Sequence, residues 1–157
     1  MKFWLMKSEP DEFSIEDLKA QPNSPWDGVR NYQARNFLRE MKEGDRVLFY
    51  HSSCKVPGVA GVAEVTRGPY PDHTSWDPES AYFDAKSSPD SPRWTMVDVS
   101  HVCTFVHHVS LTQMKATPEL ADMLLVKKGG RLSVMPVEPE HFELINQMGT
   151  NTNEAEV

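Results

Sequence analysis

The two apolar runs between Arg46 and Arg67 limit the folds open to this chain more than any other feature. The first run is Arg46 to His51 (RVLFYH), and the second is Gly58 to Arg67 (GVAGVAEVTR). Short runs rich in β-branched and aromatic residues are typical of buried strands, and the loop between these two is too long for a tight two-residue turn. We therefore expect two paired strands joined by a longer hairpin loop.

Small residues gather in the second run, at Gly58, Ala60, Gly61 and Ala63. Small side chains allow another segment of backbone to approach a strand closely, and they also leave room for a ligand beside it. The sequence therefore predicts either a close crossing by a neighbouring element or a bordering cavity.

The remaining apolar patterns are short strands and short helices that do not alternate regularly. Further strands are expected at Phe3 to Met6, Trp94 to Leu111 and Arg131 to Val137, and helices after Ser14, over Asn31 to Met41, over Leu111 to Leu125 and after Pro139. Regular alternation of strands and helices would indicate a doubly wound parallel sheet. Its absence indicates an α+β domain around a mostly antiparallel sheet, curved or closed, with ligands at one mouth.

A chain of 157 residues, 39% of them hydrophobic, is large enough for one globular domain. We expect residues 1–149 to form this domain and the polar residues 150–157 to be a disordered tail. The sequence has no apolar run long enough to span a bilayer and no secretory pattern at its start, so we expect a cytoplasmic protein. Its two cysteines, Cys54 and Cys103, lack the spacing of a metal site.

The acidic residues are unevenly distributed along the chain. The formal net charge is −7, but five of the 23 acidic residues lie in Glu138 to Val157, where there is no Lys or Arg. The rest of the chain is therefore nearly neutral, with 18 acidic and 16 basic residues. Five of these bases fall close together, at Arg30, Arg35, Arg39, Lys42 and Arg46. We expect a local basic rim, not the broad positive surface of a protein that coats long duplexes.

The segment Trp26 to Asn36 (WDGVRNYQARN) is the most polar part of the chain that also carries aromatic residues. Planar amide and guanidinium groups beside aromatic rings suit a flat heterocycle with polar edges. The alternative is an ordinary helix start, with Asn31 as the N-cap and Ala34 and Leu38 on the buried face. The second half of the segment fits the helix start. The first half holds more polar residues than a cap needs, so a binding role stays open.

A loop rich in proline and turn-forming residues spans Pro69 to Pro92. Long loops in small domains are usually functional or disordered, and disordered segments are poor in aromatic residues. Because this loop contains Tyr70, Trp76, Tyr82 and Phe83, we expect it to be ordered. Four aromatic residues lie at the edges of expected elements, where a ring can stack on a nucleobase: Trp26, Trp76, Tyr82 and Trp94.

Familiar catalytic motifs are absent, since the sequence lacks GxGxxG, GxxxxGKS/T, HExxH and GxSxG. The adjacent His107 and His108 would point to opposite faces of a strand, so we expect no metal site and no cofactor. His51, at the end of an expected strand, is the one histidine to consider for a pocket, and we expect it to be structural.

Six motifs occur in order along the chain: WLMKSEP, WDGVRNYQARN, GDRVLFYHS, GVAGVAEV, YPDHTSWDPES and RLSVMPV. With these motifs the chain resembles the EVE domain family, in its stand-alone bacterial form, from about Phe3 to about Met148. The resemblance implies a PUA-like fold, a curved antiparallel β-barrel with short helices packed around it. It also implies a pocket for a flipped-out modified base, such as a modified cytosine in DNA, while the wider superfamily is associated with modified RNA.

The resemblance carries a set of ligand-binding positions over to this chain, at strand ends, in the central segment and in the long loop. They are Trp4, Lys7, Ser8, Glu9, Val29, Arg30, Asn31, Tyr32, Gln33, Arg35, Asn36, His51, Ser52, Trp76, Tyr82, Ser133 and Met135. Trp94 joins them as an aromatic residue at the edge of a strand. In this hypothesis aromatic faces hold the base, amides read its polar edge, and Arg30 and Arg35 contact flanking phosphates of single-stranded or locally opened DNA or RNA.

Two other functions stay open at this stage. Some ASCH relatives in the same superfamily are amidohydrolases that act on acylated cytidine, and Lys7 with Glu9 could supply their nucleophile or base. The simpler interpretation of Lys7, Ser8 and Glu9 is a solvated strand end. The other function is a scaffold for protein partners. The sequence does not specify the oligomeric state.

Overall fold

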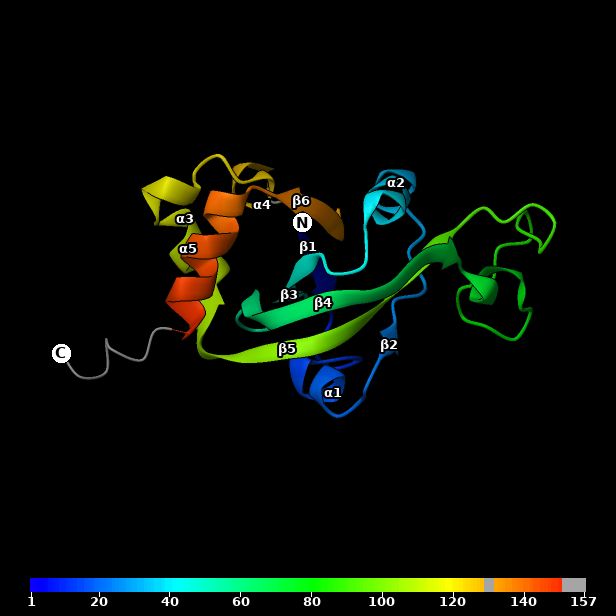
Figure 1. Cartoon of the computed structure of the whole chain (residues 1–157), viewed down its shortest axis with the longest axis horizontal. Coiled ribbons are helices and arrows are strands. Elements are labelled where there is room, and N and C mark those ends of the chain that lie inside the picture. Colours follow the sequence, from blue (N-terminus) through cyan, green and yellow to red (C-terminus); the bar gives the residue numbers. More distant parts are fainter. Residues whose placement is uncertain (129–131, 151–157) are drawn as a thin grey trace.

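The computed structural model describes residues 1–128 and 132–150, and a six-stranded sheet forms its centre (Figure 1). The strands are β1 (Phe3–Ser8), β2 (Ser24–Pro25), β3 (Arg46–His51), β4 (Gly58–Pro71), β5 (Thr95–Ser110) and β6 (Val134–Val137). Their order across the sheet is β2-β5-β4-β3-β1-β6. β1 runs parallel to β3, and the other neighbours are antiparallel. The long connection between β1 and β3 permits this, because a parallel pair needs a crossover that a tight turn cannot supply.

The helices are short and surround the sheet. They are α1 (Ile15–Lys19), α2 (Tyr32–Glu40), α3 (Leu111–Lys115), α4 (Leu124–Lys128) and α5 (Pro139–Thr150), with 3₁₀ turns at His73–Trp76 and Pro118–Leu120. Two helices begin at the expected caps. The Ser14 hydroxyl accepts a hydrogen bond from the backbone N–H of Asp17, and the Asn31 side chain accepts one from Ala34, at 3.2 and 2.9 Å. Each bond satisfies an N–H group that a helix start leaves without an internal partner.

The sheet is covered on both faces, and each face has its own hydrophobic core. Because successive side chains of a strand point to opposite faces, neighbouring residues of β1 enter different cores. Trp4 packs with residues of α1 and α2, including Leu38. Leu5 packs with residues of α3, α4 and α5, including Ile145. In Figure 1, α3, α4 and α5 gather at one end of the molecule, and the long loop projects from the other. Because β4 continues to Pro71 and β5 begins at Thr95, this loop spans residues 72–94 in the structure.

The α+β class is confirmed, but the sheet differs from the closed barrel that the resemblance implies. Among the residues described, β2 and β6 are the two edges of the sheet and no strand pair joins them. The parallel pair of β1 and β3 also makes the sheet mixed. Within residues 1–128 and 132–150, no helix is long and apolar enough to cross a membrane.

Two glycines mark places where elements pack closely. A Cβ atom at Gly61 would lie 2.3 Å from the carbonyl oxygen of Cys103 on the paired strand β5 and 3.0 Å from Cδ1 of Ile15 on α1. Of the two predicted alternatives, the close approach of a neighbouring element is the one found at this residue. Gly149, which the sequence offers as a helix end because glycine commonly follows the last turn, lies inside α5, which continues to Thr150. A Cβ atom there would meet the Phe105 ring at 2.2 Å. The expected disordered tail begins at Thr150, but Thr150 is instead the last residue of α5. The rest of that tail, residues 151–157, and the expected strand residue Arg131 lie outside the described residues.

Candidate ligand-binding site

A cavity of about 690 Å³, the main cavity, opens where β1 ends. Its walls come from β1 and the turn after it, β2 and the residues around it, the loop after β3, the segment before β6, and the long loop. The lining residues are Lys7, Ser8, Glu9, Glu12, Phe13, Gln21, Ser24, Pro25, Trp26, Asp27, Ser52, Ser53, Tyr82 and Ser133. A concave site of this size, with aromatic and polar walls, is typical of small-ligand binding.

Phe13 and Trp26 give the main cavity rigid aromatic walls. The backbone N–H of Trp26 donates to the carbonyl of Val97 at 2.7 Å, and its ring lies edge-on to Phe13, with the centroids 6.5 Å apart. The Trp26 ring also meets the buried Phe49 edge-on, at 5.6 Å. The hydroxyl of Ser8 donates to the carbonyl of Phe13 at 2.5 Å, which fixes the turn after β1. These contacts hold both rings in place before any ligand arrives.

The charged groups of the main cavity are mostly acidic. Glu9, Glu12 and Asp27 line it together with one base, Lys7. Burial raises the pKa of Asp27, and the nearby Asp72 raises it further. Burial lowers the pKa of Lys7. Such a lining offers acceptors to the amino and imino groups of a ligand, and it suits a phosphate poorly.

Gly28 allows Tyr82 to reach the wall of the main cavity. Its φ of +78° is in the left-handed region, and a Cβ atom here would lie only 2.7 Å from the Tyr82 ring. Its backbone N–H donates to the Asp72 carboxylate at 2.9 Å. Burial raises the pKa of Tyr82, and the carboxylates of Asp27 and Glu12 raise it further, so its phenol keeps its proton at neutral pH.

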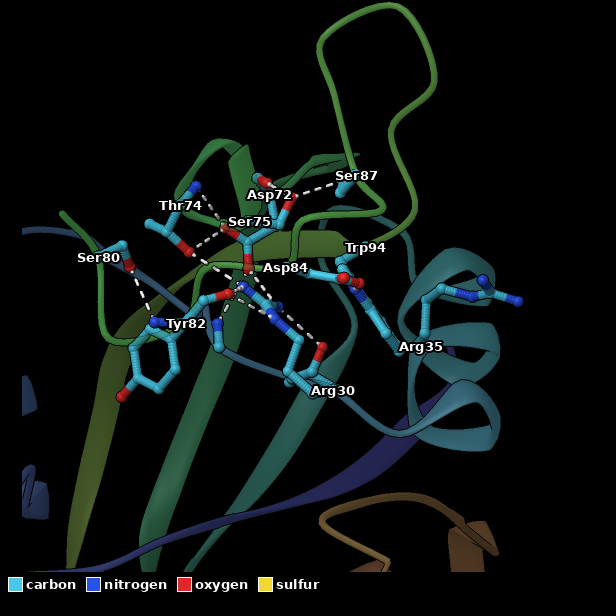
Figure 2. A network of polar contacts seen from close by, with 12 residues as sticks. Arg30, Arg35, Asp72, Thr74, Ser75, Ser80, Tyr82, Asp84, Ser87 and Trp94 are labelled. Carbon is cyan, nitrogen blue, oxygen red and sulfur yellow. Dashed lines mark hydrogen bonds and ion pairs between the residues drawn. The ribbon is translucent and has the colours of Figure 1, made fainter. Parts of the chain in front are cut away.

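Arg30 uses all five of its N–H donors within the protein, and four of them fasten the long loop to the domain (Figure 2). Two donate to the carbonyl of Tyr82, at 2.9 and 2.7 Å, and the others reach Val29, Asp72 and Thr74. Because none is left over, this side chain has no donor for a phosphate, contrary to the sequence-based hypothesis. Its role in this structure is to place Tyr82.

Asp72 is the centre of this polar network and is fully buried. Its carboxylate accepts hydrogen bonds from Gly28, Arg30 and both the N–H and the hydroxyl of Thr74. Burial alone would raise the pKa of Asp72, but these hydrogen bonds and the Arg30 charge together lower it. Farther along, the Ser75 hydroxyl contacts that of Ser87 at 2.9 Å. These contacts give the long loop a defined conformation, in line with the order that its aromatic residues predicted.

The second half of the central segment faces away from the main cavity. Asn31 caps α2, Gln33 is exposed, and Asn36 accepts hydrogen bonds from Arg35. The Tyr32 ring stacks on Trp94 with the centroids 4.9 Å apart. None of these side chains lines the main cavity, so the amides expected to read a base do not reach it from here. The helix-start interpretation holds for this half.

Six of the predicted site residues line the main cavity: Lys7, Ser8, Glu9, Ser52, Tyr82 and Ser133. Trp4, Val29 and Met135 are instead core residues, and the Trp4 indole donates to the buried Asp45 at 3.0 Å. Trp76 lies in the 3₁₀ turn of the long loop and does not line this cavity.

His51 has a structural role, as expected from the sequence. Its Nε2 atom accepts a hydrogen bond from the backbone N–H of Ile15, the first residue of α1, at 3.1 Å. Burial lowers the pKa of His51, and the neighbouring His108 lowers it further. Among the described residues, no group of three or more His, Cys, Asp or Glu side chains could hold a metal ion.

Eight lining residues were absent from the predicted set: Glu12, Phe13, Gln21, Ser24, Pro25, Trp26, Asp27 and Ser53. The pair Trp26 and Asp27 carried a signal, because it opens the polar segment with an aromatic ring beside an acceptor. Glu12 and Phe13 carried none, because a turn after a strand looks the same whether or not it closes a cavity.

Comparison with known proteins gives consistent matches. The family model described as the EVE domain matches residues 2–148. Human thymocyte nuclear protein 1 is 44% identical over 161 residues, which is 90% of this chain and 71% of the human protein. A crystal structure of human THYN1 in complex with 5-methylcytosine-containing DNA has a TM-score of 0.90 at 42% identity, covering 95% of this chain and 98% of that one.

A bacterial structure from Pseudomonas putida is 57% identical, with a TM-score of 0.88, and covers 91% of this chain and 96% of that one. The Zymomonas mobilis ASCH mutant protein has a TM-score of 0.55 at 11% identity. At that identity the similarity concerns the fold alone, so it does not support an amidohydrolase function for this chain.

Proposed function

The chain belongs to the EVE domain family, and from this premise we propose that it binds DNA by taking a modified cytosine base into the main cavity. The observation that carries the proposal is the cavity itself, with fixed aromatic walls beside carboxylate acceptors. The complex of the related human THYN1 with 5-methylcytosine-containing DNA supports the choice of ligand. The same proposal includes a relationship between this sheet and the sheets of PUA-like domains.

The chemistry of cytosine fits the lining of the main cavity. The exocyclic amino group of cytosine is a donor, and carboxylates are its usual acceptors in proteins. Asp27 and Glu12 offer such acceptors on the wall that carries Tyr82. Flat faces of Trp26 and Phe13 offer apolar contact for the ring and for a methyl group at its 5-position. In this proposal the acids select a base edge that carries an amino group. Because the Trp26 and Phe13 rings are edge-on to each other, one of them stacks on a face of the base and the other contacts its edge, while the Tyr82 ring on the cavity wall is available to the other face.

The base enters the cavity flipped out of its stack. A base inside a duplex cannot reach a concave site, and extrusion costs about a few kcal/mol, less in a single strand. Single-stranded or locally opened DNA is therefore the preferred substrate in this proposal. RNA with the same modified base is the second arm of the test.

The test compares Tyr82→Ala with Phe83→Ala in affinity for labelled oligonucleotides that differ in one central base. Both side chains are partly exposed, at 41% and 45%, but only Tyr82 lines the main cavity. We expect the native protein to prefer 5-methylcytosine over cytosine. Since aromatic stacking contributes about 1 to 3 kcal/mol per base, Tyr82→Ala should weaken binding of the methylated oligonucleotide about 5-fold to 150-fold.

Phe83→Ala is expected to bind as the native protein does. Equal affinity of the native protein for the methylated and unmethylated DNA would overturn the proposal. An equal loss in both variants would show that the main cavity is not the site. A DNA and an RNA version of each oligonucleotide decide the polymer.

A further inference from the structure

Three arginines gather where α2 meets the end of the long loop, and we name them the arginine rim: Arg35, Arg39 and Arg93. The Arg93 carbonyl accepts hydrogen bonds from Arg35 at 3.1 Å and from Arg39 at 3.5 Å. The Arg93 guanidinium donates to the Tyr32 hydroxyl at 3.0 Å. The Arg35 guanidinium lies over the Tyr32 ring, 4.8 Å from its centroid. Arg35 and Arg93 thus contact the stack of Tyr32 and Trp94, and Arg39 lies beside them through its bonds to Thr95 and the Arg93 carbonyl.

The positive charge of the arginine rim is poorly compensated within the described residues. The two ion pairs found there are Arg30 with Asp72 and Arg46 with Glu64, and neither includes a rim arginine. Asp84 is a carboxylate near Arg93, and its oxygens already accept hydrogen bonds from the Trp94 indole and the backbone N–H of Lys86. These bonds, helped by the charge of Arg93, lower the pKa of Asp84. Burial lowers the pKa of Arg35, and the charges of Arg39 and Arg93 lower it further. A cluster of like charges favours an anion.

The rim also has hydrogen-bond donors to give. The bonds described for it use three N–H groups of Arg35, two of Arg39 and one of Arg93, of the five that each guanidinium carries. Arg30, by contrast, uses all five within the protein. The difference separates an arginine that builds the fold from arginines that can bind a partner.

The arginine rim lies next to the main cavity. The Arg30 guanidinium is 5.7 Å from the centroid of the Tyr82 ring and 5.5 Å from that of Trp94, so one side chain separates the cavity wall from the rim. Figure 2 shows Arg30 between Tyr82 and Trp94, with Arg35 beyond. A second cavity of about 250 Å³, lined by Arg39, Trp94, Thr95, Tyr70 and three prolines, leaves a hollow beside the rim.

We propose that the arginine rim binds the phosphate backbone of the nucleic acid, next to the nucleotide whose base enters the main cavity. The inference rests on the proposed function for the position of the strand. Its own content is that affinity and base selectivity come from different side chains, since phosphate contacts position a strand and base contacts specify it. The hollow beside Arg39 gives room for the adjoining sugar.

The experiment measures affinity for a single-stranded DNA oligonucleotide against salt concentration. Each phosphate contact adds about 0.7 to the slope of log affinity against log salt for single strands. Arg39→Gln and Arg93→Gln are each expected to lower the slope by about this amount. Each should also weaken binding of methylated and unmethylated DNA by the same factor, about fivefold to tenfold at low salt, so their ratio is unchanged.

Two matched variants control for charge and folding. Lys115→Gln removes one positive charge from α3, at the end of the molecule opposite the long loop (Figure 1), and should keep the native slope. Arg39→Lys and Arg93→Lys keep the charge and should also keep it, because this slope depends on charge and not on the planar fork. The inference is overturned if the salt slope is unchanged in both Arg39→Gln and Arg93→Gln. It is also overturned if Arg39→Lys and Arg93→Lys lower the slope as much as the glutamine variants do.

Failure of the rim and failure of the proposed function give different results. If the native protein prefers methylated DNA but the glutamine variants keep its salt slope, the rim inference fails and the proposed function stands. If the glutamine variants lower the slope but no base is preferred, the rim stands without a base reader. The nucleoside 5-methyl-2′-deoxycytidine, which has no phosphate, should bind the native protein and both glutamine variants alike.

Discussion

Gly28 connects backbone conformation to the shape of the main cavity. Its left-handed φ, its N–H bond to Asp72 and the close approach of Tyr82 occur at one residue. A side chain at this position would strain the backbone and displace the Tyr82 ring. Arg30, two residues later, then fixes the Tyr82 backbone from the other side. The wall of the main cavity therefore depends on residues that do not themselves line it.

Asp72 stabilises the fold through its buried ion pair with Arg30. The variant Asp72→Asn removes the charge that pairs with Arg30, and breaking a buried pair typically destabilises a protein by about 3 to 5 kcal/mol. The lowered pKa of this carboxyl means that its contribution is complete above the pKa of the unfolded chain. It is lost as the pH falls through the pKa of the folded state.

Urea unfolding of native and Asp72→Asn protein at pH 7 and at low pH tests this. The difference in free energy of unfolding should be largest at pH 7 and should shrink as the solution becomes acidic. Asp90→Asn, an exposed aspartate in the same loop, should change stability little at either pH. A difference between native and Asp72→Asn that stays constant over this range would contradict the account.

At the scale of elements, α1 is held in place by a strand end. His51 closes β3 and accepts the first N–H of α1, while Ser14 and Asp17 form a capping box at the same end. The turn between β1 and α1 carries Glu12 and Phe13 into the main cavity. The position of this wall thus depends on the neutral His51 imidazole, because that ring holds the start of α1.

Acidification is therefore expected to loosen the start of α1. Protonated His51 cannot accept the Ile15 N–H, and because its pKa is lowered in the fold, this bond is complete above about pH 6.5 and lost as the pH falls through the folded value. One hydrogen bond contributes about 0.5 to 1.5 kcal/mol, so protection of the Ile15 amide from hydrogen exchange should fall roughly 2-fold to 12-fold.

The exchange measurement compares protection factors above and below this pH, corrected for intrinsic rates. His51→Gln offers an amide oxygen at every pH and should show no such fall. His101 also titrates near α1, since burial and the charge of Lys19 lower its pKa, so His101→Gln must retain the native pH dependence. A fall of the same size in His51→Gln would show that the imidazole is not the cause.

At the scale of the whole molecule, the sequence predicts local elements better than their arrangement. The hairpin of β3 and β4 and the caps Ser14 and Asn31 are confirmed, because they depend on patterns within a few residues. Core positions such as Trp4 and Met135 were assigned to the site, since a strand end gives no sign of which face meets the ligand. The order of the strands in the sheet is needed to tell which face of a strand end lies at the site.

Strand order also creates the site. β1 lies between β3 and β6, which brings Ser8, Ser52 and Ser133 together at the main cavity. The pairing of β2 with β5 adds Trp26 beside them. These residues are far apart in sequence, so no local pattern joins them. The sequence motifs indicated the family, and the family implies this arrangement, but no single motif shows it.

If the main cavity receives the modified base, an amide NMR titration detects the base there. Two oligonucleotides that differ only in a central 5-methylcytosine or cytosine are added to labelled protein. We expect the methylated one to shift the amides of Ser8 and Asp27 and the indole of Trp26 at concentrations where the other does not. Equal shifts with both, or shifts confined to the exposed face of α2 around Gln33, would contradict this account.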